Sequence, residues 1–140
     1  MTNTELNARI AKAAELHAKG YNCAQAVACT FCDKTVLSEE MIFRVTEGLG
    51  RGMGGRDATC GAISAACVLS GLKNSTAHLD SPDSKLVSYD VSDACITAFK
   101  EKNGSIVCRE LTGEDTGTPL RSCDGCIEDA VVLVAEKIFG

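Results

Sequence analysis

Residues 48–67 constrain the fold most, because glycine-rich backbone gives way there to small apolar residues. Residues 48–56 contain five glycines and two arginines, so this backbone can bend closely around another group. The apolar residues that follow are typical of a buried helix. With Asp57 or Thr59 as its N-cap, Cys60 would lie in the first turn. Free N–H groups and the helix dipole there favour a thiolate.

Hydrophobic periodicity and helix-start residues predict helices along the rest of the chain. No segment alternates apolar and polar residues strongly enough to predict a strand. We therefore expect an all-α fold, a compact bundle or orthogonal array of about five to six helices. The expected helices cover about residues 4–19, 23–33, 38–46, 60–71, 82–102 and 122–138, with a short helical segment near 105–111.

Two of these helices carry more specific expectations. The sequence Ser81-Pro82-Asp83 is a strong start signal, with serine as the cap and proline at the first helical position. The helix that follows should bury a stripe that includes Val87 and Ala94. The last helix is the most apolar, so we expect it at the centre of the fold.

Length and charge limit the class of protein. A chain of 140 residues that is 45% hydrophobic can bury one sizeable core, so we expect a single domain over residues 1–140. The net charge of −5 and the absence of a Lys/Arg-rich block argue against nucleic acid or an anionic membrane as the main partner. No segment is apolar enough to span a membrane, and the first residues lack signal-peptide features. A cytoplasmic location is therefore expected.

The nine cysteines are the most informative feature of the composition. A reducing compartment discourages structural disulfides, and an odd number cannot all pair within one chain, so metal or redox chemistry is indicated. Cys23, Cys60 and Cys123 each follow a capping residue at an expected helix start, and Cys108 has Arg109 beside it. Thiols presented at several helix N-termini suit a metal or cluster site.

The other cysteines divide into two groups. Cys67 and Cys95 lie on apolar helix faces, and the Cys-x-x-Cys pair at residues 29–32 falls late in a helix, so we interpret all of these as packing residues. The pair at residues 123–126 falls at a helix start and has the spacing found in thiol–disulfide enzymes and metal sites. Cys126 is therefore a candidate resolving thiol or auxiliary ligand.

Several other residues near the cysteines invite a functional interpretation. The Gly-x-Gly-x-x-Gly at residues 50–55 follows an expected helix, whereas a dinucleotide fingerprint follows a strand, so we expect these glycines to let backbone N–H groups approach Cys60. His17 lies on an apolar helix face, which favours a core-edge histidine over a site residue. Four arginines near the cysteines in sequence could stabilise thiolate charge, namely Arg51, Arg56, Arg109 and Arg121.

Four local signatures resemble those of a known family. They are Tyr21-Asn22-Cys23-Ala24-Gln25-Ala26, the glycine-rich loop into Cys60-Gly61-Ala62, Cys108-Arg109-Glu110-Leu111-Thr112-Gly113, and Cys123 leading into Glu128-Asp129-Ala130. Over nearly its whole length the chain resembles the redox-active proteins named for a pattern of Cys, GCAxxG, Cys and Cys. Here the central motif reads Cys-Gly-Ala-Ile-Ser-Ala, with Ser64 or Ala65 in place of the closing glycine.

The resemblance implies four family cysteines in a helical domain that acts in redox chemistry. They correspond here to Cys23, Cys60, Cys108 and Cys123. The domain is also similar to one found in some electron-carrier proteins, which implies an iron–sulfur site.

Three hypotheses follow for this cysteine-rich chain. In the first, the four cysteines converge on one metal-binding site that holds an iron–sulfur cluster, or zinc in its place, and electrons pass to a redox partner protein. In the second, the chain is a metal-free thiol–disulfide oxidoreductase, with Cys60 or Cys123 as the catalytic thiol. In the third, it is a non-catalytic module that forms a homodimer through its apolar helices. Whether the chain is an enzyme stays open among them.

Overall fold

Helices joined by loops make up the whole chain, and the computed structural model describes residues 1–140. The α-helices are α1 (Asn3–Lys19), α2 (Cys23–Cys29), α3 (Glu39–Thr46), α4 (Gly50–Met53), α5 (Gly61–Asn74), α6 (Lys85–Asn103), α7 (Cys108–Thr112) and α8 (Cys123–Lys137). Short 3₁₀ turns cover Cys32–Lys34 and Glu47–Leu49. No strand forms, and a single antiparallel bridge joins Thr59 to Val107. The prediction of an all-α fold is confirmed.

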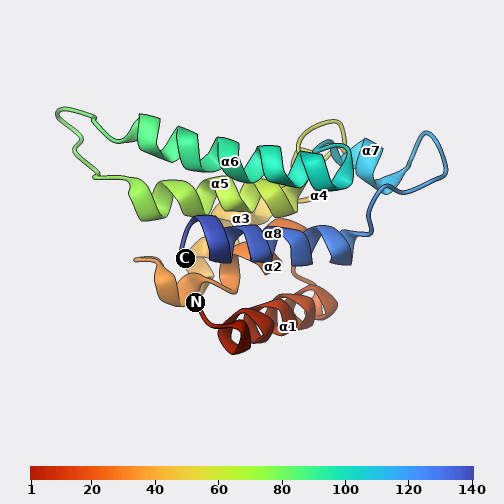
Figure 1. Cartoon of the computed structure of the whole chain (residues 1–140), viewed down its shortest axis with the longest axis horizontal. Coiled ribbons are helices and arrows are strands. Elements are labelled where there is room, and N and C mark those ends of the chain that lie inside the picture. The colour runs from red at the N-terminus through yellow and green to blue at the C-terminus, as the bar shows by residue number, and fades with distance from the viewer.

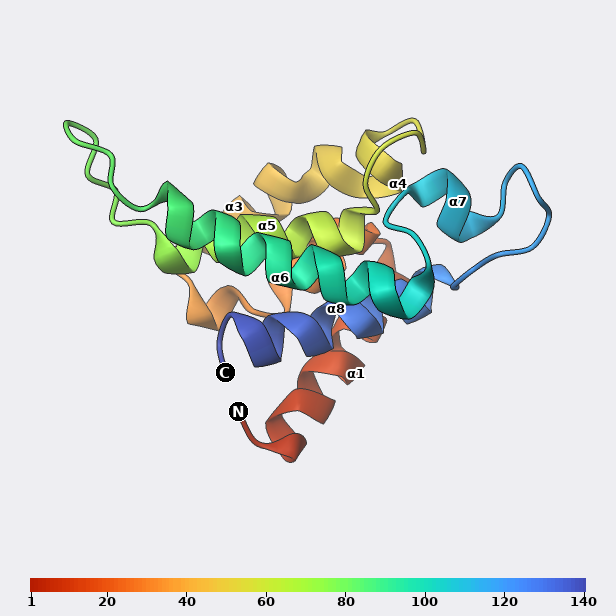
Figure 2. The same cartoon turned by 45° about the horizontal axis from the view of Figure 1, so that its top comes forward.

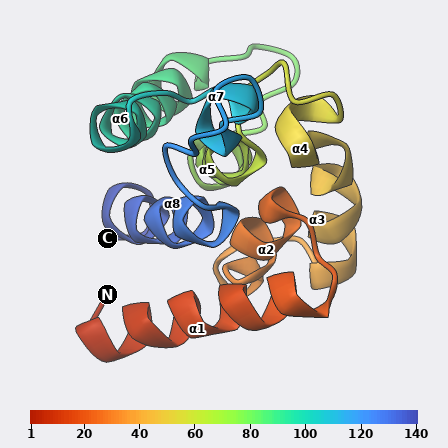
Figure 3. The same cartoon turned by 90° about the vertical axis from the view of Figure 1, so that its right-hand side faces the viewer.

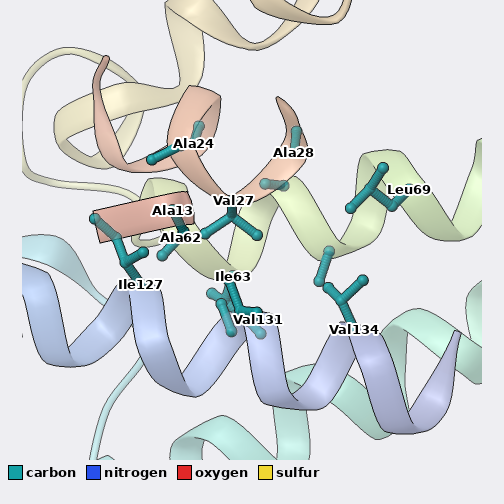
Figure 4. Packing of buried hydrophobic residues seen from close by; sticks show 14 of the residues in the cluster. Ala13, Ala24, Val27, Ala28, Ala62, Ile63, Leu69, Ile127, Val131 and Val134 are labelled. Atoms are coloured by element: carbon teal, nitrogen blue, oxygen red, sulfur yellow. The ribbon is translucent and has the colours of Figure 1, made fainter. Parts of the chain in front are cut away.

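Helices α5 and α8 lie at the centre of the packing. α5 contacts α2, α6 and α8, and α8 also contacts α1, α2 and α6, so the expected central position of the last helix is confirmed, although α5 is the more apolar of the two. Figure 4 shows Val27, Ile63 and Val131, from α2, α5 and α8, pointing into the same space. Each such buried side chain contributes about 1.5–3 kcal/mol through removal of apolar surface from water. Ala62 in α5 is also fully buried, and so small a side chain allows neighbouring helices to approach closely.

The two ends of the bundle differ. The long loop between α5 and α6 extends from one end, whereas α4, α7 and the N-terminal ends of α5 and α8 gather at the other (Figures 1 and 2). Figure 3 looks at this second end, where several chain segments meet. None of the helices has both the length and the apolarity needed to cross a bilayer.

Local capping fixes the starts of two cysteine-bearing helices where the sequence predicted them. The Asn22 side chain accepts a hydrogen bond from the Gln25 backbone N–H, and the Gln25 side chain bonds back to the Asn22 N–H, so α2 begins at Cys23. The Ser122 hydroxyl accepts from the Gly125 N–H, and α8 begins at Cys123.

The predicted start of α5 is wrong. The helix begins at Gly61, and Cys60 is itself the N-cap residue, without a side-chain hydrogen bond. Thr59 cannot cap because it pairs with Val107 in the bridge. The Asp57 carboxylate accepts from the guanidinium of Arg109 at 2.8 Å and is equally unavailable.

The long helix α6 also starts later than predicted, at Lys85 instead of near residue 82. Asp83 is engaged in the preceding loop, where its carboxylate accepts from the Thr76 hydroxyl and pairs with His78. Val87 and Ala94 were expected on the buried face, but both are exposed on the outer side of α6. The helix from Cys23 is shorter than expected and ends at Cys29.

Candidate functional site

One cavity of about 180 Å³ lies at the end of the bundle where the cysteine-bearing helices begin. The structure brings all four candidate cysteines, Cys23, Cys60, Cys108 and Cys123, to its wall, and Cys126 is a fifth. The rest of the wall consists of His17, Asn22, Arg51, Arg56, Gly61, Leu111, Thr112 and Arg121. We call this space the cysteine cavity.

The four candidate cysteines converge because each lies at the start of a helix that begins at this end of the bundle. Cys23, Cys108 and Cys123 are the first residues of α2, α7 and α8, and Cys60 precedes the first residue of α5. The bridge at Thr59 and the Cys60 N–H, which donates to the Ile106 carbonyl at 2.7 Å, hold the starts of α5 and α7 together. Four segments that are far apart in sequence therefore present their thiols to one space.

The five cavity thiols are not equally accessible. Cys60, Cys108 and Cys126 are buried, Cys23 is half-buried and Cys123 is exposed. All nine cysteines of the chain are free thiols. Cys123 therefore marks the open edge of the cavity.

The thiols are not arranged around a single point. No group of three Cys, His, Asp or Glu side chains is placed to hold one metal ion. Mononuclear zinc requires its ligands about 2.3 Å from one centre. In an iron–sulfur cluster the thiolates bind different iron atoms and stand farther apart.

The thiol pKa values are raised, not lowered as the sequence predicted for Cys60. A hydrogen bond to Cys126, together with burial, raises the pKa of Cys60 to about 12. Hydrogen bonding to Cys60, and burial, raise the pKa of Cys23, although the backbone N–H groups of Arg51 and Ala24 act in the opposite direction. Without a bound cation these thiols are protonated at neutral pH, because the hydrogen bonds between the cysteines, together with burial, outweigh the backbone N–H groups that lower the pKa.

The same burial argument covers the remaining two family cysteines. Burial raises the pKa of Cys108 and of Cys123, and neighbouring cysteines add to both shifts. The Arg56 guanidinium lowers both pKa values, but by less. A coordinating metal deprotonates a thiol outright, so these groups would become thiolates on binding a metal group.

Glycines make room for the cysteine side chains. A Cβ on Gly61 would lie 2.6 Å from the Cys23 sulfur, and a Cβ on Gly52 would lie 2.6 Å from the Cys108 Cβ. The sequence predicted that the loop glycines would approach Cys60, but Gly52 lies against Cys108 and Gly50 against Asn22. Side chains at Gly52 and Gly61 would displace candidate ligands.

The glycine-rich loop holds two arginines in an unusual backbone conformation. Arg51 has φ of 57° and Arg56 has φ of 70°, in the left-handed region that non-glycine residues rarely adopt. Such a conformation costs of order 1–3 kcal/mol per residue and persists only where the surroundings enforce it. Both residues line the cysteine cavity, and the Arg51 backbone N–H contacts the Cys23 thiol. The strain therefore accompanies the placement of positive charge beside the thiols.

Three of the four arginines singled out from the sequence reach the cavity wall, namely Arg51, Arg56 and Arg121. Arg109 does not, because it pairs with Asp57 and with Glu114 outside the cavity. No carboxylate lines the cavity. The wall therefore combines thiols with arginines, two of which are paired with carboxylates outside the lining, Arg121 with Asp129 and Arg56 with Glu114.

His17 is the site residue that the sequence interpretation assigned to the core edge. It lines the cavity, and its Nδ1 lies 2.7 Å from the Asp124 Oδ1. Packing of α1 against α8 brings the two together. One sequence feature could have pointed to this pair, because Asp124 directly follows Cys123, a candidate ligand.

The cysteines assigned to packing are mostly where the sequence placed them. Cys29 and Cys95 belong to the buried core, and Cys32 packs against it. Cys67 is only half-buried, so its assignment to the core was too strong. Tyr21 turns away from the cavity, because its hydroxyl donates to Glu39.

The fold and the cavity define a helical protein with five thiols gathered at one end of the bundle. The family model described as "Putative redox-active protein (C_GCAxxG_C_C)" matches residues 21–137, and the chain belongs to this family. The match includes all five cavity cysteines but not His17. Comparisons with curated proteins and with solved structures each found no match.

Proposed function

We propose that this protein is an electron carrier whose cavity cysteines bind an iron–sulfur cluster and whose partner is an oxidoreductase. The observation that carries the proposal is the convergence of Cys23, Cys60, Cys108 and Cys123 on one cavity. Four cysteine thiolates are the usual protein ligands of such clusters, and the cluster, when bound, supplies one-electron transfer.

The residues of the wall fit this group. Arg51, Arg56 and Arg121 offset the negative charge that thiolate ligands concentrate in a partly buried space. Free thiols persist in a reducing compartment, so we place the protein in the cytoplasm.

Thiol–disulfide exchange is the second candidate function, and the hydrogen bond between Cys60 and Cys126 favours it. Cys126 would be the resolving thiol. Against this candidate, an attacking cysteine must be a thiolate, and the pKa of Cys60 is raised by its hydrogen bond to Cys126 and by burial, while partial desolvation and the nearby Cys23 raise the pKa of Cys123.

Anaerobic reconstitution with iron and sulfide tests the proposal. The wild-type protein should bind both and develop visible absorption, and Cys60→Ser should lose both signals, because serine does not replace a thiolate ligand. Cys67→Ser is the matched control, since Cys67 is half-buried in α5 but is not part of the cavity. It should reconstitute like the wild type.

Wild-type protein that binds no iron would contradict the electron-carrier proposal. Mass spectrometry after mild oxidation with glutathione disulfide would then test the second candidate. A disulfide between Cys60 and Cys126 that forms and is reduced reversibly would support thiol–disulfide exchange.

A further inference from the structure

His17 and Asp124 form a histidine–carboxylate pair at the open edge of the cysteine cavity. Nδ1 of His17 lies 2.7 Å from Oδ1 of Asp124. An ionised carboxylate only accepts hydrogen bonds, so Nδ1 carries the proton and donates. In the neutral ring, Nε2 then keeps its lone pair, and no hydrogen bond of the protein engages it.

The position of the pair is as informative as its geometry. His17 comes from the last turn of α1 and lines the same cavity as the five thiols. Asp124 follows Cys123 in the first turn of α8, so one helix start supplies both a thiol and the carboxylate. The His17 side chain is 31% exposed and the Asp124 side chain 80% exposed, so burial does not require them to pair.

A carboxylate on one ring nitrogen is the usual companion of a histidine whose other nitrogen binds a metal. The carboxylate fixes the tautomer, orients the ring and raises the basicity of the ligating nitrogen. His17 lines the same cavity as the five thiols, and its Nε2 makes no hydrogen bond within the protein.

We propose that His17 is a further ligand in the cysteine cavity, with Nε2 as its donor atom and Asp124 as its positioning residue. This inference rests on the proposed function. Five thiols and one imidazole exceed by two the four protein ligands that a cluster uses. In this arrangement His17 would replace one of the thiolates as a ligand. Nε2 would supply its lone pair to iron, and the cysteine that it replaces would stay a protonated thiol.

A histidine ligand in place of a thiolate would change the reduction potential of the cluster. Imidazole is a neutral ligand and thiolate is an anion, so histidine ligation leaves less negative charge on the cluster. Less negative charge raises the reduction potential, as it does where histidines replace cysteines on one iron of a two-iron cluster. In His17→Cys the potential should therefore be lower than in the wild type.

Isotope labelling tests the proposal directly. Protein grown with ¹⁵N-histidine is reconstituted with iron and sulfide, brought to its paramagnetic state and measured by pulsed EPR. The chain has two histidines, so any ¹⁵N coupling can be assigned with two variants. The coupling should be present in the wild type and lost in His17→Ala.

His78→Ala is the matched control, because His78 also pairs through Nδ1 with an aspartate, Asp83, at 2.9 Å. It lies in the loop between α5 and α6 and is absent from the cavity wall. This variant should keep the full ¹⁵N coupling. In Asp124→Ala the coupling should weaken or become heterogeneous, because the ring is no longer oriented.

The outcomes separate this inference from the proposed function. If the wild type assembles a cluster without ¹⁵N coupling, and His17→Cys has the wild-type potential, His17 is not a ligand and the electron-carrier proposal stands. If the wild type binds no iron, both proposals fail. The labelled wild type answers the question even where a variant is unstable.

Discussion

Replacing Gly61 by alanine is expected to abolish the proposed uptake of an iron–sulfur cluster while the protein remains helical. The added Cβ would lie 2.6 Å from the Cys23 sulfur and 2.8 Å from the Leu49 carbonyl oxygen, distances that real Cβ atoms do not adopt. The Leu49 oxygen belongs to the backbone and yields little, so the Cys23 sulfur must move. Overpacking of this kind also costs about 1–3 kcal/mol of unfolding free energy. Iron content, visible absorption and circular dichroism measure these effects.

Gly71→Ala is the matched control within the same helix. No atom lies within 4 Å of a Cβ built on Gly71. Alanine in a helix interior is more favourable than glycine by roughly 0.5–1 kcal/mol, so this variant should unfold at a higher temperature and bind iron normally. Equal iron binding by Gly61→Ala and Gly71→Ala would show that the position of Cys23 does not depend on Gly61.

Sequence patterns predicted the structural elements wherever local interactions decide them. The starts of α2 and α8 depend on Asn22 and Ser122, whose side chains cap N–H groups three residues away. The start of α5 depends instead on Val107, which pairs with Thr59 from a distant part of the chain. Propensity cannot reveal such a contact, so Cys60 was placed one position too far inside the helix.

In the cavity, too, features set by local sequence were predictable and features set by long-range packing were not. Cysteines at helix starts were recognisable because each has a local signature, and the family pattern links Cys23 with Cys123. The role of His17 depends on how α1 packs against α8, and the periodicity of α1 alone placed it on an apolar face. Arg109 was adjacent to a candidate ligand in sequence, but Asp57 draws its side chain away.

Asp129→Asn is expected to lower the unfolding free energy at neutral pH by about 2 kcal/mol, in the range for hydrogen bonds to a charged group. Asp129 is 4% exposed, and its carboxylate accepts hydrogen bonds from Arg121, Lys102 and Asn103. Burial alone would raise the pKa of Asp129, but these partners outweigh it and lower the pKa. Because Lys102 and Arg121 are partly exposed, asparagine leaves no buried charge unpaired.

The lowered pKa fixes the sign of the pH dependence. A carboxyl group that is more acidic when folded contributes stability that is present above its unfolded pKa, near 3.9, and is lost as the pH falls through the folded value. Urea titrations from pH 7 to pH 3 should therefore show a steeper loss for the wild type than for Asp129→Asn. Glu136→Gln, at an exposed α8 position without an ion pair, should follow the wild type. Parallel profiles for the wild type and Asp129→Asn would mean that Asp129 is not linked to acid stability. Because Arg121 is held by Asp129 and lines the cavity, Asp129→Asn should also reconstitute with less iron than Glu136→Gln.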